Sequence, residues 1–260
     1  MSHQIRATTT WTCLISLSKL LIHQHRTDTG HNVGFTSVDA GNMSLTVLDR
    51  HHTAEDTANN RRALEVALGI EPGTTRFVSQ THSSIVQSSG DQGWTQVETI
   101  GEGDAIVSED GTDPIAILVA DCLPIAFTTD YGPTAIAHAG RVGLLGGILQ
   151  NTVQQLRTLD AQGTGTITAT IGPGVCGQCY EVPESMRDQA SLDHPAIFSE
   201  TTWGTPALDL PAAAEDILRQ RGVVVQRVEE CTLTNERLFS HRRNPGVGRL
   251  AGVVWQTRES

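Results

Sequence analysis

The sequence predicts a single α/β domain, and three observations support that prediction. Short apolar runs rich in β-branched residues, bounded by turn-forming residues, recur along the chain and indicate buried strands. Between them lie segments whose apolar residues recur at helical spacing, for example residues 58–68. A chain of 260 residues could form one large domain or two small ones, and no repeat, linker or low-complexity tract divides it.

Residues 115–143 form the stretch around which the rest of the chain is organised. It contains three apolar, β-branched runs, at residues 115–120, 125–129 and 134–137. The tetrapeptide Asp-Tyr-Gly-Pro separates the second run from the third, and these residue types form turns. We therefore expect three strands, the last two joined as a hairpin.

This hairpin is expected to bring a thiol and an imidazole together at one end. His138 would lie opposite Ile125, close to the point at which Cys122 enters the hairpin. Pro124 suits the beginning of a strand because it has no backbone N–H to donate. A helix is expected to start just after His138 and to run to about Leu156. A thiolate, an imidazole and a helix N-terminus together form a site for a cation or an anion.

The remaining elements follow from the same patterns. We expect helices at residues 58–68, 185–189 and from 208 to a stop at Gly222, the first of them led by acidic residues. Strands are expected at residues 164–171, 223–228 and 231–234, with a strand and loop over 35–47, a strand from Arg76 to a polar break at 80–83, and a strand or helix over 13–22.

The overall charge and the cysteine content exclude several classes of protein. A formal net charge of −11 argues against a nucleic-acid or membrane-surface partner, because both favour basic patches. An anionic substrate would therefore need a local arginine cluster. Five cysteines in a chain of this size do not form a disulfide scaffold, and they favour a reducing cytoplasm. The apolar stretch at 13–22 is too short and too interrupted for a signal peptide.

Several polar residues each have a structural and a functional interpretation. His82 follows a strand, where a single histidine is more often a hydrogen-bonding residue than a ligand. Asp104 is either a turn residue or an acceptor that orients a ligating imidazole. For Arg61, the spacing favours a solvated helix face over an inward-facing anion ligand. Arg242 and Arg249 concentrate positive charge in the C-terminal loop of an otherwise acidic protein.

The pair Cys176 and Cys179 forms a CxxC motif, which can mark a zinc knuckle or a redox pair. No second CxxC or nearby histidine pair completes a four-ligand site in the sequence. We therefore expect these two cysteines to lie apart from the main site and to hold no metal of their own. His23 and His25 are two residues apart, and such a pair near a terminus is usually solvated.

An ordered series of short motifs runs through the chain: QTH (80–82), GDA (103–105), ADCLP (120–124), AHAG (137–140), IGP (171–173), CYEV (179–182), LDL (208–210), CT (231–232) and SHRRN…GR (240–249). The series resembles the laccase-domain family, also called multicopper polyphenol oxidoreductase or YfiH-like purine nucleoside phosphorylase. The resemblance runs from about Phe35 to Trp255. It implies an N-terminal extension over residues 1–34 and one family domain over residues 35–260.

The resemblance implies a single domain in which a layered, mixed β-sheet is flanked by helices. It also implies a mononuclear zinc site formed by His82, Cys122 and His138, and phosphorolysis of adenosine, inosine and methylthioadenosine, in some members with adenosine deamination. Two imidazoles and a thiolate independently match catalytic zinc with an open fourth position. The chain departs from the family at Arg141, which is shifted by one position, and at Thr46 and His241. These departures concern the rim of the substrate site.

A zinc ion with one thiolate ligand carries a net charge of about +1 and would attract phosphate. Its remaining charge could be held by Arg61, Arg141, Arg242 or Arg249. In a deamination reaction, Asp104 is the candidate to shuttle protons.

Three rival hypotheses remain. In a hydrolase, Cys122 would be the nucleophile and His138 the base, which leaves His82 without a role. In a copper oxidase, a multicopper site is rejected because such sites use about ten imidazoles, largely in repeated HxH pairs, and this chain has one such pair; copper is less favoured than zinc. The non-enzyme alternative is a metal-binding structural or regulatory protein.

Overall fold

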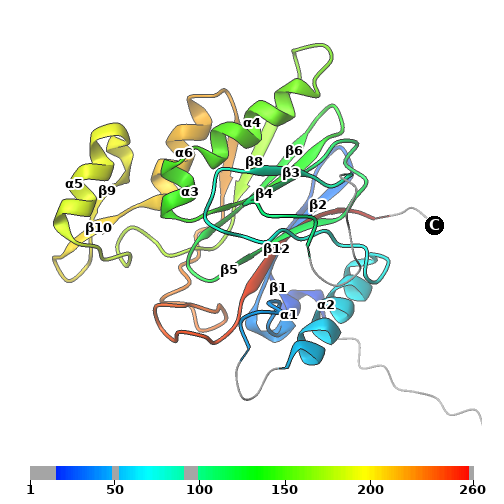
Figure 1. Cartoon of the computed structure of the whole chain (residues 1–260), viewed down its shortest axis with the longest axis horizontal. Coiled ribbons are helices and arrows are strands. Elements are labelled where there is room, and N and C mark those ends of the chain that lie inside the picture. The colour runs from blue at the N-terminus through cyan, green and yellow to red at the C-terminus, as the bar shows by residue number, and fades with distance from the viewer. Residues whose placement is uncertain (1–15, 49–52, 91–98, 258–260) are drawn as a thin grey trace, which may run out of the picture.

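A computed structural model describes residues 16–48, 53–90 and 99–257. The strands form two large sheets and one small ribbon, with helices on both outer sides (Figure 1). The six-stranded sheet has the order β11 (Val224–Arg227), β8 (Ile167–Ile171), β6 (Leu123–Thr129), β7 (Thr134–Ala139), β4 (Ala105–Ser108) and β3 (Val86–Ser88). The four-stranded sheet has the order β1 (Leu21–Arg26), β2 (His31–Thr36), β12 (Leu250–Gln256) and β5 (Ile115–Val119).

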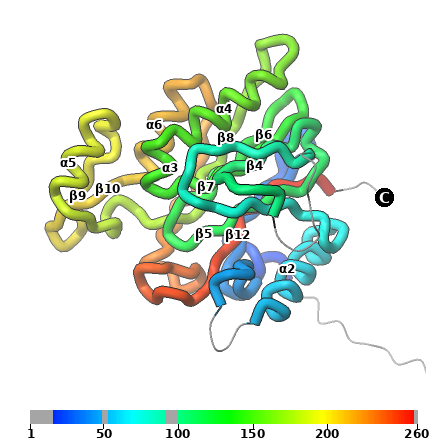
Figure 2. The backbone as a smooth tube through the Cα atoms, in the orientation of Figure 1, coloured from blue at the N-terminus to red at the C-terminus, as the bar shows by residue number. Residues whose placement is uncertain are grey.

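The helices and the small ribbon lie outside these sheets. The ribbon pairs β9 (Phe198–Glu200) with β10 (Pro206–Leu208) and lies with α5 at one end of the molecule, away from α2 (Figure 2). The helices are α1 (Leu17–Leu20), α2 (Ala54–Leu68), α3 (Arg141–Leu145), α4 (Ile148–Thr158), α5 (Glu184–Asp193) and α6 (Leu210–Arg219), with 3-10 turns at Val38–Ala40 and Pro195–Ile197.

The two large sheets pack face to face because their strands are apolar on both sides. Along β7, Ala135 and Ala137 face the core beneath the helices, whereas Ile136 faces the other sheet. The core between the sheets also contains Phe35 from β2 and Ile117 from β5. Strands buried on both faces read as continuous apolar runs, which is the pattern that the sequence shows. The predicted layered, mixed α/β fold is confirmed.

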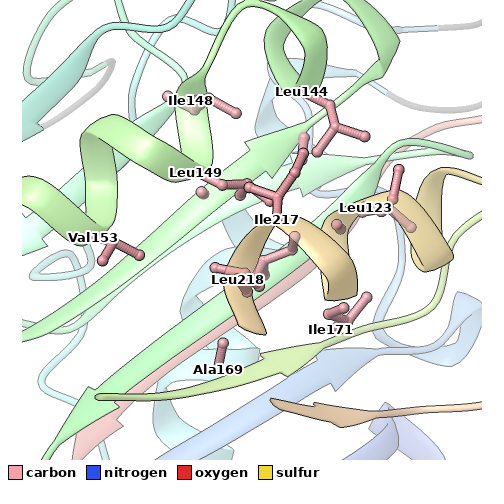
Figure 3. Close-up of a cluster of buried hydrophobic side chains, with 14 of the residues drawn as sticks. Leu123, Leu144, Ile148, Leu149, Val153, Ala169, Ile171, Ile217 and Leu218 are labelled. Atoms are coloured by element: carbon pink, nitrogen blue, oxygen red, sulfur yellow. The ribbon is translucent and has the colours of Figure 1, made fainter. Parts of the chain in front are cut away.

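Helices α3, α4 and α6 cover the outer face of the six-stranded sheet. Figure 3 shows Leu144 of α3, Ile148 of α4 and Ile217 of α6 in one buried cluster with Leu123 and Ile171 of the sheet. This cluster is fully buried and is the largest core of the described chain. It anchors the strands that carry the site described below.

Helix α2 covers the four-stranded sheet and has clear start and stop signals. Thr53 and Asp56 form a capping box in which each side chain accepts from the other residue's backbone N–H. The helix ends at Gly69, whose φ of 72° is the left-handed conformation that glycine adopts without strain. The helix predicted at residues 58–68 is therefore confirmed, and it begins four residues earlier.

The hairpin of β6 and β7 is confirmed, but its register differs by one residue from the prediction. His138 pairs with Pro124, and Ile125 pairs with Ala137. The first apolar run, β5, belongs to the other sheet, where it pairs with β12. Sheet assignment depends on partners far along the chain, so the local pattern could not reveal it.

Three further predictions need correction. The helix expected over 141–156 is broken at Gly146 and Gly147 into α3 and α4, and Gly147 has a φ of 94°. The strand expected at 231–234 is reduced to one bridge, between Cys231 and Gly174. The segment after Arg76 makes isolated bridges, and its regular strand, β3, starts only at Val86.

Two observations concern the ends of the domain. The boundary expected at residue 34 falls inside β2, and β1 and β2 together supply half of the four-stranded sheet. Among the described helices, none combines the length and the apolar character that a membrane crossing requires.

Candidate metal centre

The β6–β7 hairpin positions the first two candidate ligands. Cys122 stands directly before β6, and His138 lies one residue before the end of β7. Because Leu123 pairs with Ala139 and Pro124 with His138, both candidate ligands lie at the same end of the hairpin. Ligands held on paired strands have little freedom to move, so this part of the site is rigid.

His82 approaches from a separate turn. Its backbone φ of 59° is unusual for a residue other than glycine, and the turn directs its ring toward the hairpin. The Nε2 atom of His82 is 3.8 Å from the Cys122 sulfur, and the His82 and His138 ring centroids are 4.9 Å apart. One ligand atom from each of the three residues lies within 4.8 Å of the other two. The structure thus brings together the three residues chosen from the sequence.

Asp104 organises this group from behind. It is fully buried, and its Oδ1 atom lies 2.7 Å from Nδ1 of His138, whose N–H it accepts. It also accepts hydrogen bonds from the backbone N–H groups of Thr81, His82 and Ser83 and from the Ser83 hydroxyl. One carboxylate therefore fixes the His138 ring and the turn that carries His82. This is the arrangement by which carboxylates orient metal-binding imidazoles.

Gly140 leaves the space in which the ligands meet. A Cβ atom at this position would lie 2.8 Å from the Cys122 sulfur and 2.8 Å from Cδ2 of His82. Any larger residue would have to displace one of the two ligands. The close approach of the two ligands therefore explains why the last position of the AHAG motif is a glycine.

The three titrating groups of the centre shift one another's pKa. Burial favours the neutral thiol of Cys122, but hydrogen bonds with His138 and His82 outweigh it and lower the pKa to about 6. Burial also opposes the charge on His138, yet its contacts with Asp104 and Cys122 raise its pKa to about 9. The pKa of Asp104 falls to about 2: burial again opposes the charge, and hydrogen bonds from His138 and Ser83 overcome it. Without a metal, the centre favours a thiolate beside an imidazolium.

A cavity of about 940 Å³ opens in front of these ligands. His82, Cys122 and His138 line it, together with the loop at 44–47 and residues from β5. Cavities of this size hold small molecules and cofactors. The ligand set is therefore accessible from a pocket large enough for a substrate.

Two of the four candidate phosphate-binding arginines line this cavity. Arg61 of α2 donates from Nε to the Met43 carbonyl at 2.8 Å and lies over the Phe77 ring at 3.8 Å, and burial lowers its pKa to about 10. Arg249 comes from the end of the C-terminal loop. Burial lowers its pKa, although the nearby Cys122 acts in the opposite direction.

The other two arginines are placed elsewhere. Arg141 is the first residue of α3 and is not part of the cavity lining. Arg242 lies over the Tyr180 ring at 4.4 Å and lines a different hollow. The helix expected to present its N-terminus to the site is only five residues long, so its dipole is weak.

The sequence analysis overlooked two residues that shape the site. Asn42 is buried and accepts from the backbone N–H groups of Ser44 and Arg249, while its amide donates to the Ser44 and Val47 carbonyls. Asp121 has a φ of 84° and accepts from the Thr232 hydroxyl at 2.6 Å. Their signal was their position: Asn42 follows a glycine in a turn, and Asp121 precedes the ligand Cys122.

Comparisons with known proteins identify the family of the chain. The family model described as multi-copper polyphenol oxidoreductase laccase matches residues 25–257. A protein of Streptomyces coelicolor named purine nucleoside phosphorylase is 38% identical over 198 residues, which is 75% of this chain and 81% of the relative. A Streptomyces griseus protein, also named purine nucleoside phosphorylase, is 36% identical over 224 residues, which is 85% of this chain and 90% of the relative.

Solved structures show the same fold. YlmD from Geobacillus stearothermophilus superposes with a TM-score of 0.77 at 28% identity, covering 88% of this chain and 93% of that one. A Neisseria meningitidis protein of family DUF152 gives a TM-score of 0.74 at 27% identity, covering 88% and 95%. With a family match across nearly its whole length, the chain belongs to the multi-copper polyphenol oxidoreductase laccase family, whose YfiH-like members share its fold.

Proposed function

We propose that this protein is a zinc-dependent purine nucleoside phosphorylase, in which His82, Cys122 and His138 hold one zinc ion at the floor of the cavity. The observation that carries the proposal is the His-Cys-His set with an aspartate behind it and an open cavity in front of it. The names of the relatives support an enzyme of this kind. Adenosine, inosine and methylthioadenosine are the expected nucleosides.

The donor atoms suit zinc. Because Nδ1 of His138 binds Asp104, its Nε2 atom is the nitrogen left to bind a metal, and the Cys122 pKa of about 6 provides a thiolate at neutral pH. Two imidazoles and a thiolate are also ligands of electron-transfer copper sites. Those sites do not need a substrate pocket, whereas a catalytic zinc site keeps an open position, and the open cavity favours zinc.

When bound, the zinc ion would supply positive charge that attracts and polarises an oxyanion. Arg249 and Arg61 would hold the other oxygens of phosphate, since both line the cavity and burial strengthens their ion pairs. In the reaction, the glycosidic C1′–N9 bond breaks and a C1′–O bond to phosphate forms, while the purine leaves with a proton. Asp104 would act by holding the His138 ring, because its oxygens are already engaged.

A second function is favoured by a separate observation. Cys122, His138 and Asp104 also form a chain of thiol, imidazole and carboxylate, as in cysteine hydrolases. In that scheme the Cys122 thiolate attacks the substrate and His138 supplies a proton to the leaving group. The position of His82, 3.8 Å from the Cys122 sulfur, favours a metal site because the hydrolase scheme has no use for this residue.

The test is to supply zinc-loaded protein with adenosine and phosphate and to measure adenine and ribose 1-phosphate. The proposed function requires both products in equal amounts, and removal of zinc by a chelator should abolish their formation. Activity that survives chelation but is lost on alkylation of Cys122 would instead support the hydrolase. Inosine formed without phosphate would reveal adenosine deamination.

The metal content is checked separately by elemental analysis. The Cys122→Ala and His82→Ala variants should each lose the zinc ion of this centre, whereas copper in its place would overturn the choice of metal. The thiolate must remain reduced for this chemistry, which fits a cytoplasmic protein.

A further inference from the structure

We propose that Cys176, Cys179 and Cys231 form a second metal site, in which three thiolates bind one soft closed-shell cation, zinc or copper(I). Their sulfur atoms all lie within 4.8 Å of one another. Ligand sulfurs about 2.3 Å from a tetrahedral metal lie about 3.8 Å apart, so side-chain adjustments of under an ångström would complete the site. The inference is independent of the proposed phosphorylase activity.

The fold supplies the third ligand that the sequence analysis did not find. Strands β8 and β11 are parallel neighbours, so their carboxyl ends lie at the same edge of the sheet. The chain continues beyond β8 to the CxxC motif and beyond β11 to Cys231. Gly174 and Cys231 form a parallel bridge, in which Thr232 donates to the Gly174 carbonyl at 3.0 Å. The expectation that the CxxC pair holds no metal rested on the absence of a second ligand pair, and it did not consider a single third cysteine.

The local backbone is already shaped for metal ligands. The N–H groups of Cys179 and Tyr180 both donate to the Cys176 carbonyl at 3.0 Å, which closes the CxxC turn and places both sulfurs on one side. The backbone N–H of Cys176 donates to the Cys231 sulfur at 3.4 Å. Hydrogen bonds of this kind stabilise thiolates. All three cysteines are free thiols, so the sulfurs are available for coordination.

The surroundings explain the choice of a soft cation. Three thiols at this separation cannot all ionise unless a cation compensates their charge, and thiolates select soft metals. Cys179 is buried, whereas Cys176 and Cys231 are half-buried, so a metal can enter from one side. A hollow of about 510 Å³ lies beside Cys179 and could hold a fourth, solvent-derived ligand for zinc. Copper(I) needs only the three thiolates.

A metal at this site would link the two loops that hydrogen-bond to Asp121, one containing Val175 and the other Thr232. Thr232, next to Cys231, donates from its hydroxyl to Asp121, and the N–H of Val175, next to Cys176, donates to the Asp121 carbonyl at 2.9 Å. Asp121 directly precedes Cys122. A cation at the three-cysteine site would therefore tie together the segments that position the first metal centre, which is a structural role.

The experiment counts bound metal in the full-length protein after equilibration with zinc and removal of free zinc by gel filtration. Wild type should hold two equivalents, while Cys231→Ser and Cys179→Ser should each hold one. The matched control, Cys122→Ser, should also hold one, and Cys122→Ser combined with Cys231→Ser should hold none. A parallel anaerobic titration with copper(I) tests whether the same three cysteines take that ion.

A wild type with a single zinc equivalent that Cys122→Ser abolishes and Cys231→Ser leaves intact, and with no copper(I) bound by the three cysteines, would overturn the proposal. So would a mass 2 Da below the reduced value, assigned to a disulfide within the cluster, in protein purified under reducing conditions.

Cobalt(II) bound to Cys122→Ser gives a test that does not depend on folding of the cluster variants. That protein should show strong thiolate-to-cobalt charge transfer from three sulfurs, and the absence of the band would refute zinc as the ion of this site.

Discussion

The two thiol-containing clusters of this protein differ in their supports and in what they face. The centre of His82, Cys122 and His138 is built largely on strand ends, has a buried carboxylate behind it and faces a cavity of about 940 Å³. The cluster of Cys176, Cys179 and Cys231 is built on loops, contains only thiols and lies beside a smaller hollow of about 510 Å³. The first arrangement suits catalysis and the second suits structural support.

The difference shows what makes a ligand set reactive. Asp104 holds His138 in one orientation and one tautomer, and the cavity leaves room for a substrate beside the thiolate. The three-cysteine cluster instead joins loops that follow two neighbouring strands. The predictions below separate these roles, beginning with the largest expected effect.

Replacing His138 by Ala should reduce phosphorolysis of adenosine to the background rate, because it removes a ligand and leaves Asp104 without its partner. Cys231→Ser should retain most of the activity at 25 °C but lower Tm by about 4 °C or more, as expected when a structural metal is lost. Initial rates and thermal unfolding of both variants test this contrast. It fails if Cys231→Ser is as inactive as His138→Ala while still folded.

Asp104→Asn should weaken zinc binding at the first centre by about 10–100-fold, because carboxylates behind metal-bound histidines contribute on this scale. The change keeps the shape of the side chain but removes its charge and one acceptor. Competition with a zinc chelator measures the affinity. Thr232→Val removes the hydroxyl bonded to Asp121, the residue before Cys122, without touching a histidine ligand, and it should have a smaller effect. Equal losses in both variants would contradict the special role of Asp104.

In metal-free protein, iodoacetamide should modify Cys122 with a pH midpoint near 6. Only the thiolate reacts, and a lowered pKa preserves the thiolate down to that pH, so the rate should be flat above about pH 7 and fall below about pH 6. Cys179 should behave oppositely, because burial and the neighbouring thiols raise its pKa to about 12. Peptide mass spectrometry gives both profiles. A Cys122 midpoint near 8.5, the ordinary thiol value, would count against the proposed pairing with His138 and His82.

Arg249→Ala should raise KM for phosphate by about tenfold, and by more than it raises KM for the nucleoside, because one charge-assisted contact is lost. Arg61→Ala should act in the same direction but also cost stability, since Arg61 packs on Phe77 and binds the Met43 carbonyl. Arg141→Ala is the matched comparison. Arg141 is not part of the cavity lining, so we expect KM for phosphate to change by no more than about twofold. A larger phosphate effect for Arg141 than for Arg249 would reverse the assignment.

Much of this molecule could be predicted from local sequence. The start and the end of α2 are marked by local residues, a capping box and a terminal glycine. The β6–β7 hairpin follows from two apolar runs on either side of a turn. The pairing of Cys122 with His138 follows in turn from that hairpin. His82 was added by resemblance to a family, and the structure brought it to the same point.

Tertiary structure alone decided the features that depend on distant segments. β5 pairs with β12 and not with β6, the next strand in the sequence. Its two faces are both apolar, and each is buried in a different core, one on either side of the four-stranded sheet. Cys231 joins a CxxC motif 52 positions away because β8 and β11 end at the same sheet edge. Which arginines reach the cavity also depended on the packing of α2, which carries Arg61, and of the C-terminal loop, which carries Arg249. Spacing along the chain determines helices and hairpins, whereas contacts between remote strands are fixed only when the whole core packs.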